Sequence, residues 1–486
     1  MRRAVPVLAL AFASCVGAVP RSYVVPLHYA DHEPPRAPSE DAPFRVTAPI
    51  RPAQGLPSLA DVRSFVLANG MHVLVVERPA FPTVAARLSI DTGAMEAVDV
   101  GGRRAFLLGR VFLSSLERAM QTTTSDCDVV GCAVASRGPS NQLAEVLGRI
   151  ASRVTQKNDP SATYEQRFPA ALRAFDQAES LVKRNAAALL FGDGHRYGQP
   201  PSAYSPSLDE LDRVREQAFV PSASTLVVAG RVTTDAVKAE AMRQFGGWPD
   251  HSTTDPQKAA AVPGRSPPPP LDRPRVVACY SKGMTQVFGA IVARGPPPQA
   301  PDRAAFEVLV QRLGGVGDSI AFHQVREELG AAYSVNATVQ WYPDASFMIL
   351  AGSFASDLAI SGMKALLDGI RGVREAGVSD DDLDRARNAM IGAWRTSLET
   401  NEGVANVLGT QGLLGVSPEH LRGRAERLEA VDGSEVRAAA QRYLPTGALR
   451  FVLIGDPGNL AAAENLGFGA PAQRDGFGRQ VVSVQP

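Results

Sequence analysis

Histidine spacing offers only a weak candidate for a metal site. His28 and His32 are four residues apart, which on a helix would place both imidazoles on one face, where they could bind a metal ion. Both lie in a proline-rich stretch where no helix is expected, because proline removes a backbone donor and fixes φ. We therefore expect no metal ion at this pair.

Cysteine spacing and the absence of several motifs narrow the chemistry further. Cys127 and Cys132 could close a small loop as a disulfide in an oxidising compartment, although buried free thiols are also compatible with the spacing. No Cys-x-x-Cys occurs, so neither a zinc ribbon nor a thioredoxin-like site is supported. A Gly-x-Ser-x-Gly elbow and a Walker-type loop are also absent, and His195 and His323 have no readable triad partner. Serine hydrolases and nucleotide-binding proteins are therefore not supported.

Composition and charge set the class of protein. The 486 residues include 50 basic and 50 acidic side chains, so the summed charge gives no long-range attraction for nucleic acid or an anionic membrane. Hydrophobic residues make up 45% of the chain, enough for two or three cores of ordinary size. We expect two modules and no nucleic-acid partner.

The N-terminus is typical of an export signal. Two arginines precede an apolar run, Ala4 to Ala13, that is too short to span a bilayer. Cleavage after Ala18 and lipid attachment at Cys15 both fit this segment. We therefore expect residues 1–18 to be a signal peptide, and the protein to be periplasmic or a lipoprotein tethered to the outer membrane of a bacterium. A lipid at Cys15 would be its one attachment to a membrane.

A tether and a first module are expected next. Residues 19–59 are rich in proline and charge and are expected to be extended. The module, residues 60–255, opens with two apolar runs separated by Asn69-Gly70, the strongest short-range signal for a β-hairpin. Its other predicted elements are strands at Ala85 to Ile90 and Ser224 to Gly230, and helices at Arg103 to Arg118 and through Met242.

A second module is expected to repeat this plan. A stiff proline-rich linker, residues 256–272, precedes it, the module spans residues 273–465, and a tail follows at residues 466–486. Both halves close on an apolar strand that leads into glycine, which indicates an internal duplication. The predicted fold is α+β: two homologous modules, each a mostly antiparallel sheet flanked by helices, forming a clam-like pair. Predicted elements of the second module are strands at Arg275 to Tyr280, Gln286 to Val292 and Arg450 to Asp456, and a helix at Arg303 to Leu313.

Four segments occur in an informative order and spacing. They are Leu67 to Met71, Asp91 to Glu96, Leu190 to Gly198 and Arg326 to Val335. Together they resemble the pitrilysin/insulinase family of zinc peptidases, and most closely its two-domain branch, which includes the mitochondrial processing peptidases. The resemblance extends over residues 60–460.

The resemblance also shows what this chain lacks. Active members of the family carry a His-x-x-Glu-His helix, in which two histidines bind zinc and the glutamate activates water. Phe106, Gly109 and Arg110 stand at those three positions. A phenyl ring offers no lone pair, glycine has no side chain, and a guanidinium stays protonated and repels a cation. The family's third ligand, a glutamate, has no convincing match, so we expect no zinc in this chain and no peptidase activity from it alone.

A retained family element is an arginine followed seven residues later by a tyrosine, here Arg326 and Tyr333. In heterodimeric members this pair comes from the subunit opposite the metal. Locally, Asp318 can cap a helix through Val325, and Gly330 can end it, so that the pair projects from adjoining elements. Two such donors could hold a scissile carbonyl and stabilise its developing charge. Alternatively, Arg326 pairs with a carboxylate on its own helix and Tyr333 fills the core.

Gly314, Gly315 and Gly317 resemble the family's glycine-rich loop, which touches substrate in processing peptidases, although glycines before a helix also serve turns. Taken together, the resemblance implies a non-catalytic subunit that binds peptide substrate. It would form a heterodimer with a metal-bearing two-domain peptidase subunit, and that partner would carry the zinc. The alternative is a structural scaffold protein of the envelope with no role in proteolysis.

Overall fold

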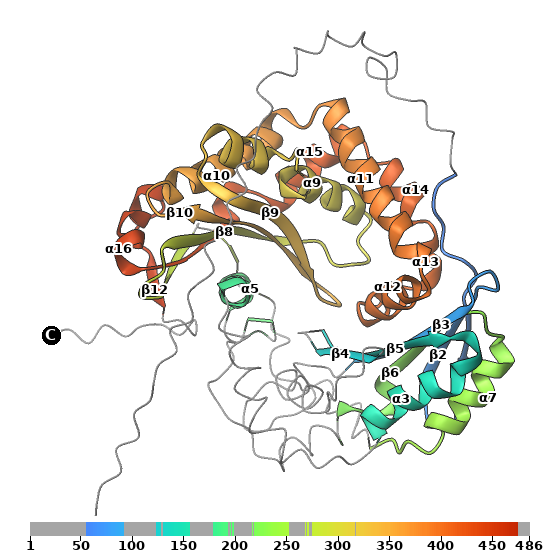
Figure 1. Ribbon diagram of the computed structural model, residues 1–486. Coiled ribbons are helices and arrows are strands. Elements are labelled where there is room, and N and C mark those ends of the chain that lie inside the picture. The colour runs from blue at the N-terminus through green and yellow to red at the C-terminus, as the bar shows by residue number, and fades with distance from the viewer. Residues whose placement is uncertain are drawn as a thin grey trace, which may run out of the picture. The chain divides into compact units, whose positions relative to one another are not determined.

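The computed structural model describes residues 55–91, 123–127, 130–155, 178–192, 195, 197–198, 216, 218–251, 268, 270–271, 275–315 and 317–474. The predicted signal peptide, the helix at Arg103 to Arg118, and most of the tether and the linker lie outside these ranges. From Leu56 onward the chain forms one compact unit with two six-stranded sheets (Figure 1). Within the described ranges, no helix is long and apolar enough to cross a membrane.

The first sheet has the strand order β1-β2-β6-β3-β5-β4. All neighbouring strands are antiparallel except β2 and β6, which are parallel. The predicted hairpin at Asn69-Gly70 is confirmed: β1 pairs with β2, and Gly70 has a φ of +87°, which glycine adopts without strain. The strands are β1 (Arg63–Val66), β2 (His72–Glu77), β3 (Thr83–Ile90), β4 (Thr123–Cys127), β5 (Cys132–Pro139) and β6 (Ser224–Gly230).

The second sheet repeats the plan, with the order β12-β7-β11-β8-β10-β9. Its parallel pair of β7 and β11 occupies the place of β2 and β6, which confirms the duplicated α+β fold. The sheet continues past residue 465, because β12 pairs with β7 and the Phe468 ring stacks on Phe451. The strands are β7 (Arg275–Tyr280), β8 (Gln286–Gly295), β9 (Ala332–Trp341), β10 (Ser346–Ala355), β11 (Arg450–Gly455) and β12 (Ala472–Arg474).

One face of each sheet is covered by helices of its own half. In the first, α3 (Leu143–Thr155) and α7 (Thr234–Phe245) pack on the sheet through an apolar core that includes Val146, Ile150 and Phe245. In the second, α9 (Arg303–Gly314), α10 (Ala359–Ala376) and α15 (Gly433–Tyr443) do the same. The remaining α-helices of the second half are α11 (Asp380–Glu399), α12 (Asn401–Leu413), α13 (Pro418–Arg422), α14 (Arg424–Glu429) and α16 (Pro457–Leu460).

The other face of each sheet is covered by a helix from the opposite half of the chain (Figure 1). Helix α5 (Ala178–Phe191) lies on β8, β10 and β11, where Leu190 and Phe191 join a buried cluster with Val292 and Val452. Helix α12 lies on β3 and β6, where Leu408 is buried. The two halves are therefore packed together by an exchange of helices.

The cysteines differ in state. Cys132 is disulfide-bonded, and the register of β4 and β5 places the backbone of Cys127 opposite it. The side chain of Cys127 lies outside the described part of the chain. Cys279 is a buried free thiol on β7. A disulfide at Cys132 fits the oxidising compartment that the N-terminal segment predicts.

Candidate functional site

Arg326 and Tyr333 lie side by side where the edge strand of the second sheet begins. Arg326 is on η3 (Phe322–Glu328), a helix with the wide π-type turn, and Tyr333 is the second residue of β9. Gly330, with a φ of +59°, turns the chain between them. The guanidinium carbon of Arg326 is 5.1 Å from the centre of the Tyr333 ring and 4.8 Å from that of Phe322. Cation–π contacts therefore hold the arginine between two aromatic rings.

Both members of the pair face solvent. Tyr333 is 80% exposed, so it does not fill the core. Glu327, the carboxylate next to Arg326 in sequence, pairs with His323 instead. Among the described residues, Arg326 forms no ion pair and the Tyr333 hydroxyl forms no hydrogen bond. The guanidinium and the phenol are thus open to a ligand. The alternative, in which Arg326 pairs with a carboxylate of its own helix and Tyr333 fills the core, does not describe this arrangement.

The start of η3 corrects one expectation. Asp318 does not cap the helix, because its carboxylate pairs with Arg385, with 2.8 Å between Oδ2 and Nε. The buried hydroxyl of Ser319 instead accepts from the backbone N–H of Phe322 at 3.3 Å. Helices with the π-type turn are rare and occur frequently at functional sites. The form of η3 is therefore consistent with a functional role for Arg326.

The three glycines before η3 differ from one another. Gly314 is buried at the end of α9, where a Cβ would lie only 2.7 Å from the backbone nitrogen of Ala337 on β9. Gly315 follows the helix, and Gly317 is exposed with nothing within 4 Å of a Cβ. Gly314 thus allows α9 to contact the strand that carries Tyr333.

We expect Gly314→Ala to lower the free energy of unfolding by about 1–3 kcal/mol, because α9 or β9 must shift to admit a methyl group. Gly317→Ala is the matched control and should be neutral or slightly stabilising, since the space around it is open. Chemical denaturation followed by circular dichroism measures both. Equal effects of the two substitutions would contradict the close approach at Gly314.

A groove of about 350 Å³ lies between α5 and β9, the strand that carries Tyr333. Val182 and Lys183 form its wall on α5. The sequence analysis did not predict this groove. Polar and apolar residues alternate along β9, however, and such a period-2 pattern indicates a strand with one polar face. The polar column on β9 consists of Ser334, Asn336, Thr338 and Gln340.

His195, on the loop after α5, has a structural role. Its ring stacks on Phe191 with 5.2 Å between centres, and its Nδ1 accepts from the backbone N–H of Tyr197 at 3.1 Å. Tyr197 stacks on Tyr342, with 3.9 Å between centres. Arg294 on β8 donates to a backbone carbonyl of α5, and burial lowers the pKa of its guanidinium. These contacts fix the end of α5 to the second sheet.

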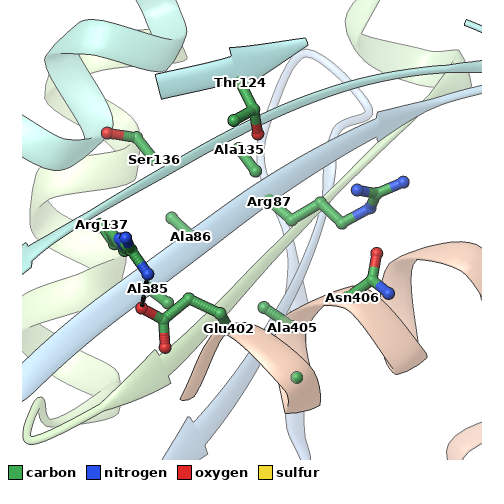
Figure 2. A pocket seen from close by; sticks show the side chains of 11 residues that line it. Ala85, Ala86, Arg87, Thr124, Ala135, Ser136, Arg137, Glu402, Ala405 and Asn406 are labelled. Atoms are coloured by element: carbon green, nitrogen blue, oxygen red, sulfur yellow. Dashed lines mark hydrogen bonds and ion pairs between the residues drawn. The ribbon is translucent and has the colours of Figure 1, made fainter. Parts of the chain in front are cut away.

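A second cavity, of about 450 Å³, lies where α12 crosses the first sheet (Figure 2). Arg137 and Glu402 form an ion pair at one end, with 3.1 Å between Nη1 and Oε1, and Arg87 and Asn406 lie at the other. Among the described residues that line it, one is a carboxylate and none is histidine or cysteine, so these residues do not offer a zinc ligand set. Small side chains make the hollow between these ends: Ala85, Ala86, Ala135, Gly403 and Ala405.

The degenerate zinc-motif positions Phe106, Gly109 and Arg110 lie outside the described residues, and so does Cys15. Among the residues described, no group of three or more His, Cys, Asp or Glu could hold a metal ion. The side chains at the three motif positions do not fit zinc, because they provide no lone-pair donor.

Comparison with known proteins bears on this arrangement. A Mycobacterium tuberculosis protein named as an uncharacterized zinc protease is 24% identical over 421 residues, which cover 81% of this chain and 93% of that protein. Residues 206–390, which include Arg326 and Tyr333, match the family model described as the peptidase M16 inactive domain. The chain is therefore similar to M16 peptidases, with the family model matching part of each half.

Solved structures show that the chain has the fold of two-domain M16 proteins. A peptidase M16 inactive domain from Pseudomonas fluorescens superposes with a TM-score of 0.70 at 17% identity, covering 82% of this chain and 98% of that one. A protease from Helicobacter pylori gives a TM-score of 0.70 at 13% identity, covering 82% and 100%. M16 is the pitrilysin/insulinase family, so the resemblance carried by the sequence segments is confirmed.

Proposed function

We propose that this chain is a non-catalytic subunit that binds peptide substrate and completes the active site of a metal-bearing partner. Arg326 and Tyr333 donate hydrogen bonds to the carbonyl oxygen of the bond to be cleaved, and the partner carries zinc on its own His-x-x-Glu-His helix. The N-terminal segment supports a location in a bacterial envelope, with a lipid at Cys15 as an optional anchor.

The observation that supports this proposal is the exposed Arg326–Tyr333 pair. Tyr333 is 80% exposed, and cation–π contact keeps the guanidinium beside the phenol. Two donors fixed in this way stabilise an oxyanion without reorganising during the reaction. The residue types at positions 106, 109 and 110 do not fit a metal, so a partner has to supply it.

The test is reconstitution with a two-domain M16 peptidase from the same organism that has the intact motif. Mixing should create zinc-dependent endopeptidase activity, which this chain alone lacks. Tyr333→Phe keeps the ring under Arg326 but removes the hydroxyl, and Arg326→Ala removes the guanidinium. Each should lower kcat about 100-fold or more, as the loss of one oxyanion donor does elsewhere.

The control is Tyr280→Phe, the same change on β7, which should leave the rate unchanged. Size-exclusion chromatography should show that all variants still associate with the partner. If Arg326→Ala and Tyr333→Phe both retain the full rate, the donor role is wrong. Copurification with a large envelope assembly that contains no peptidase would support the scaffold alternative.

A further inference from the structure

We propose that the groove between α5 and β9 binds an extended, uncharged segment of unfolded polypeptide. The inference rests on the proposed function, because it extends the substrate site away from Arg326 and Tyr333. Tyr333 is followed directly by Ser334, the first residue of the polar column on β9. The register of β9 against β10 shifts here, so Tyr333 is the extra residue of a bulge at the end of the column, next to Ser334.

Residues that pair side by side across neighbouring strands form rows on the second sheet, and these rows explain why a groove is present there. On the face that α5 covers, Val452, Ala290, Ala351 and Asn336 lie in one row across β11, β8, β10 and β9. The row is apolar below α5 and becomes polar at the edge strand. Because the side chain of Ala351 is short, the surface of the sheet is recessed next to α5.

The polar column is free to bind a ligand. Ser334, Asn336 and Thr338 are exposed, and their side chains form no hydrogen bond with other residues in the described ranges. Hydroxyl and amide groups each supply both a donor and an acceptor. They can therefore bind the N–H and C=O groups of an extended backbone, whatever side chains it carries.

The length and charge of the groove define the ligand. From Ser334 to Gln340 the column spans seven residues, or six steps of a strand and about 20 Å, which matches a segment of about seven residues. Among the described residues that line the groove, Lys183 is the only ionisable one, and it already takes part in another interaction. Because burying an unpaired charge is costly, acidic and basic side chains are disfavoured at the positions that face the sheet. The occupant is thus a neutral stretch of unfolded chain.

The experiment is fluorescence anisotropy on the full chain without its partner. The probe is a labelled eight-residue peptide of serine, alanine, asparagine and leucine with blocked ends, and a second probe has aspartate at alternate positions. We expect the neutral probe to bind at least 10-fold more tightly. Ala351→Leu, which fills the groove next to α5, should weaken binding of the neutral probe at least 10-fold. Asn336→Leu, which removes the amide's donor and acceptor groups but keeps a branched side chain with the same number of heavy atoms, should weaken it about 5-fold.

Ala355→Leu is the matched control: the same change on β10, at an exposed position outside the groove, with no expected effect. Circular dichroism checks that each variant is folded. Unchanged affinity in both groove variants would place the peptide elsewhere, including on the open edge of β9, and would overturn the proposal. Equal affinity for the two probes would overturn the neutral selectivity. The donor role of Arg326 and Tyr333 is judged separately, by partner-dependent cleavage.

Discussion

Glu307→Ala is expected to lower the free energy of unfolding by about 3–5 kcal/mol, the usual cost of breaking a buried ion pair. Glu307 on α9 is 9% exposed and lies between two arginines. Its Oε1 is 2.9 Å from Nε of Arg303, and its Oε2 is 2.9 Å from Nη2 of Arg424 on α14. Arg303 also donates to Gln411 of α12. Removal of the carboxylate leaves buried positive charge uncompensated where three helices meet.

The same group predicts a pH dependence. Burial alone would raise the pKa of Glu307, but Arg424 and Arg303 outweigh it and hold the pKa below its ordinary value of 4.5. A lowered pKa in the folded state stabilises the protein at all pH values above the unfolded pKa. This stabilisation is lost as pH falls from about 4.5 through the folded pKa. Glu307→Gln should therefore be less stable than the parent at pH 7, and the difference should shrink below pH 4.

Urea denaturation at several pH values measures both effects. The control is Arg371→Ala, which breaks an exposed pair with Asp368 and should change the free energy of unfolding by less than about 1 kcal/mol. If Glu307→Ala were as mild as Arg371→Ala, the buried ion pair would not contribute to stability as described.

Phe191→Ala is expected to cost about 3–5 kcal/mol, as truncation of a buried aromatic usually does. Phe191 is 2% exposed, and the rings of Tyr342 and Phe347 meet it edge-on at 5.8 and 6.1 Å between centres. Because Phe191 ends α5, its loss should weaken the attachment of α5 to the second sheet before the rest of the fold unfolds.

Limited proteolysis and chemical denaturation together test this prediction. In Phe191→Ala, cleavage between residues 178 and 198 should become faster at denaturant concentrations where both sheets remain folded. Phe81→Ala is the control, because Phe81 is 40% exposed and its removal leaves no core cavity. Protection of α5 equal to that of the parent would show that Phe191 is not its anchor.

The local elements were predictable, whereas their long-range pairing was not. The turn at Asn69-Gly70 and the strands that end at Gly230 and Gly455 are specified by short apolar runs next to glycine. The parallel pairing of β2 with β6 joins residues such as His72 and Thr225, which are far apart in the sequence. No local pattern specifies such a partner, since packing of the whole sheet selects it.

In the candidate site, too, the local features were predictable and the long-range contacts were not. A helix, a glycine and a strand placed Arg326 next to Tyr333 on local grounds alone. The predicted cap, Asp318, was wrong. Asp318 and Ser319 can both cap a helix, but the carboxylate of Asp318 forms an ion pair with Arg385, which is distant in the sequence. The polar column on β9 had a readable alternation. Which of its faces stays open depends on α5, whose docking on the second sheet no local pattern reveals.

The exchange of α5 and α12 bears on how the duplicated chain arose. A single-module ancestor would have exposed the helix that corresponds to α5 and α12, and also the face of its sheet that such a helix now covers. Two copies related by a twofold axis could cover both by swapping the helix, in a self-complementary homodimer. The present polypeptide contains both halves of that swap, and fusion of two such genes would have preserved the packing while freeing each copy to diverge.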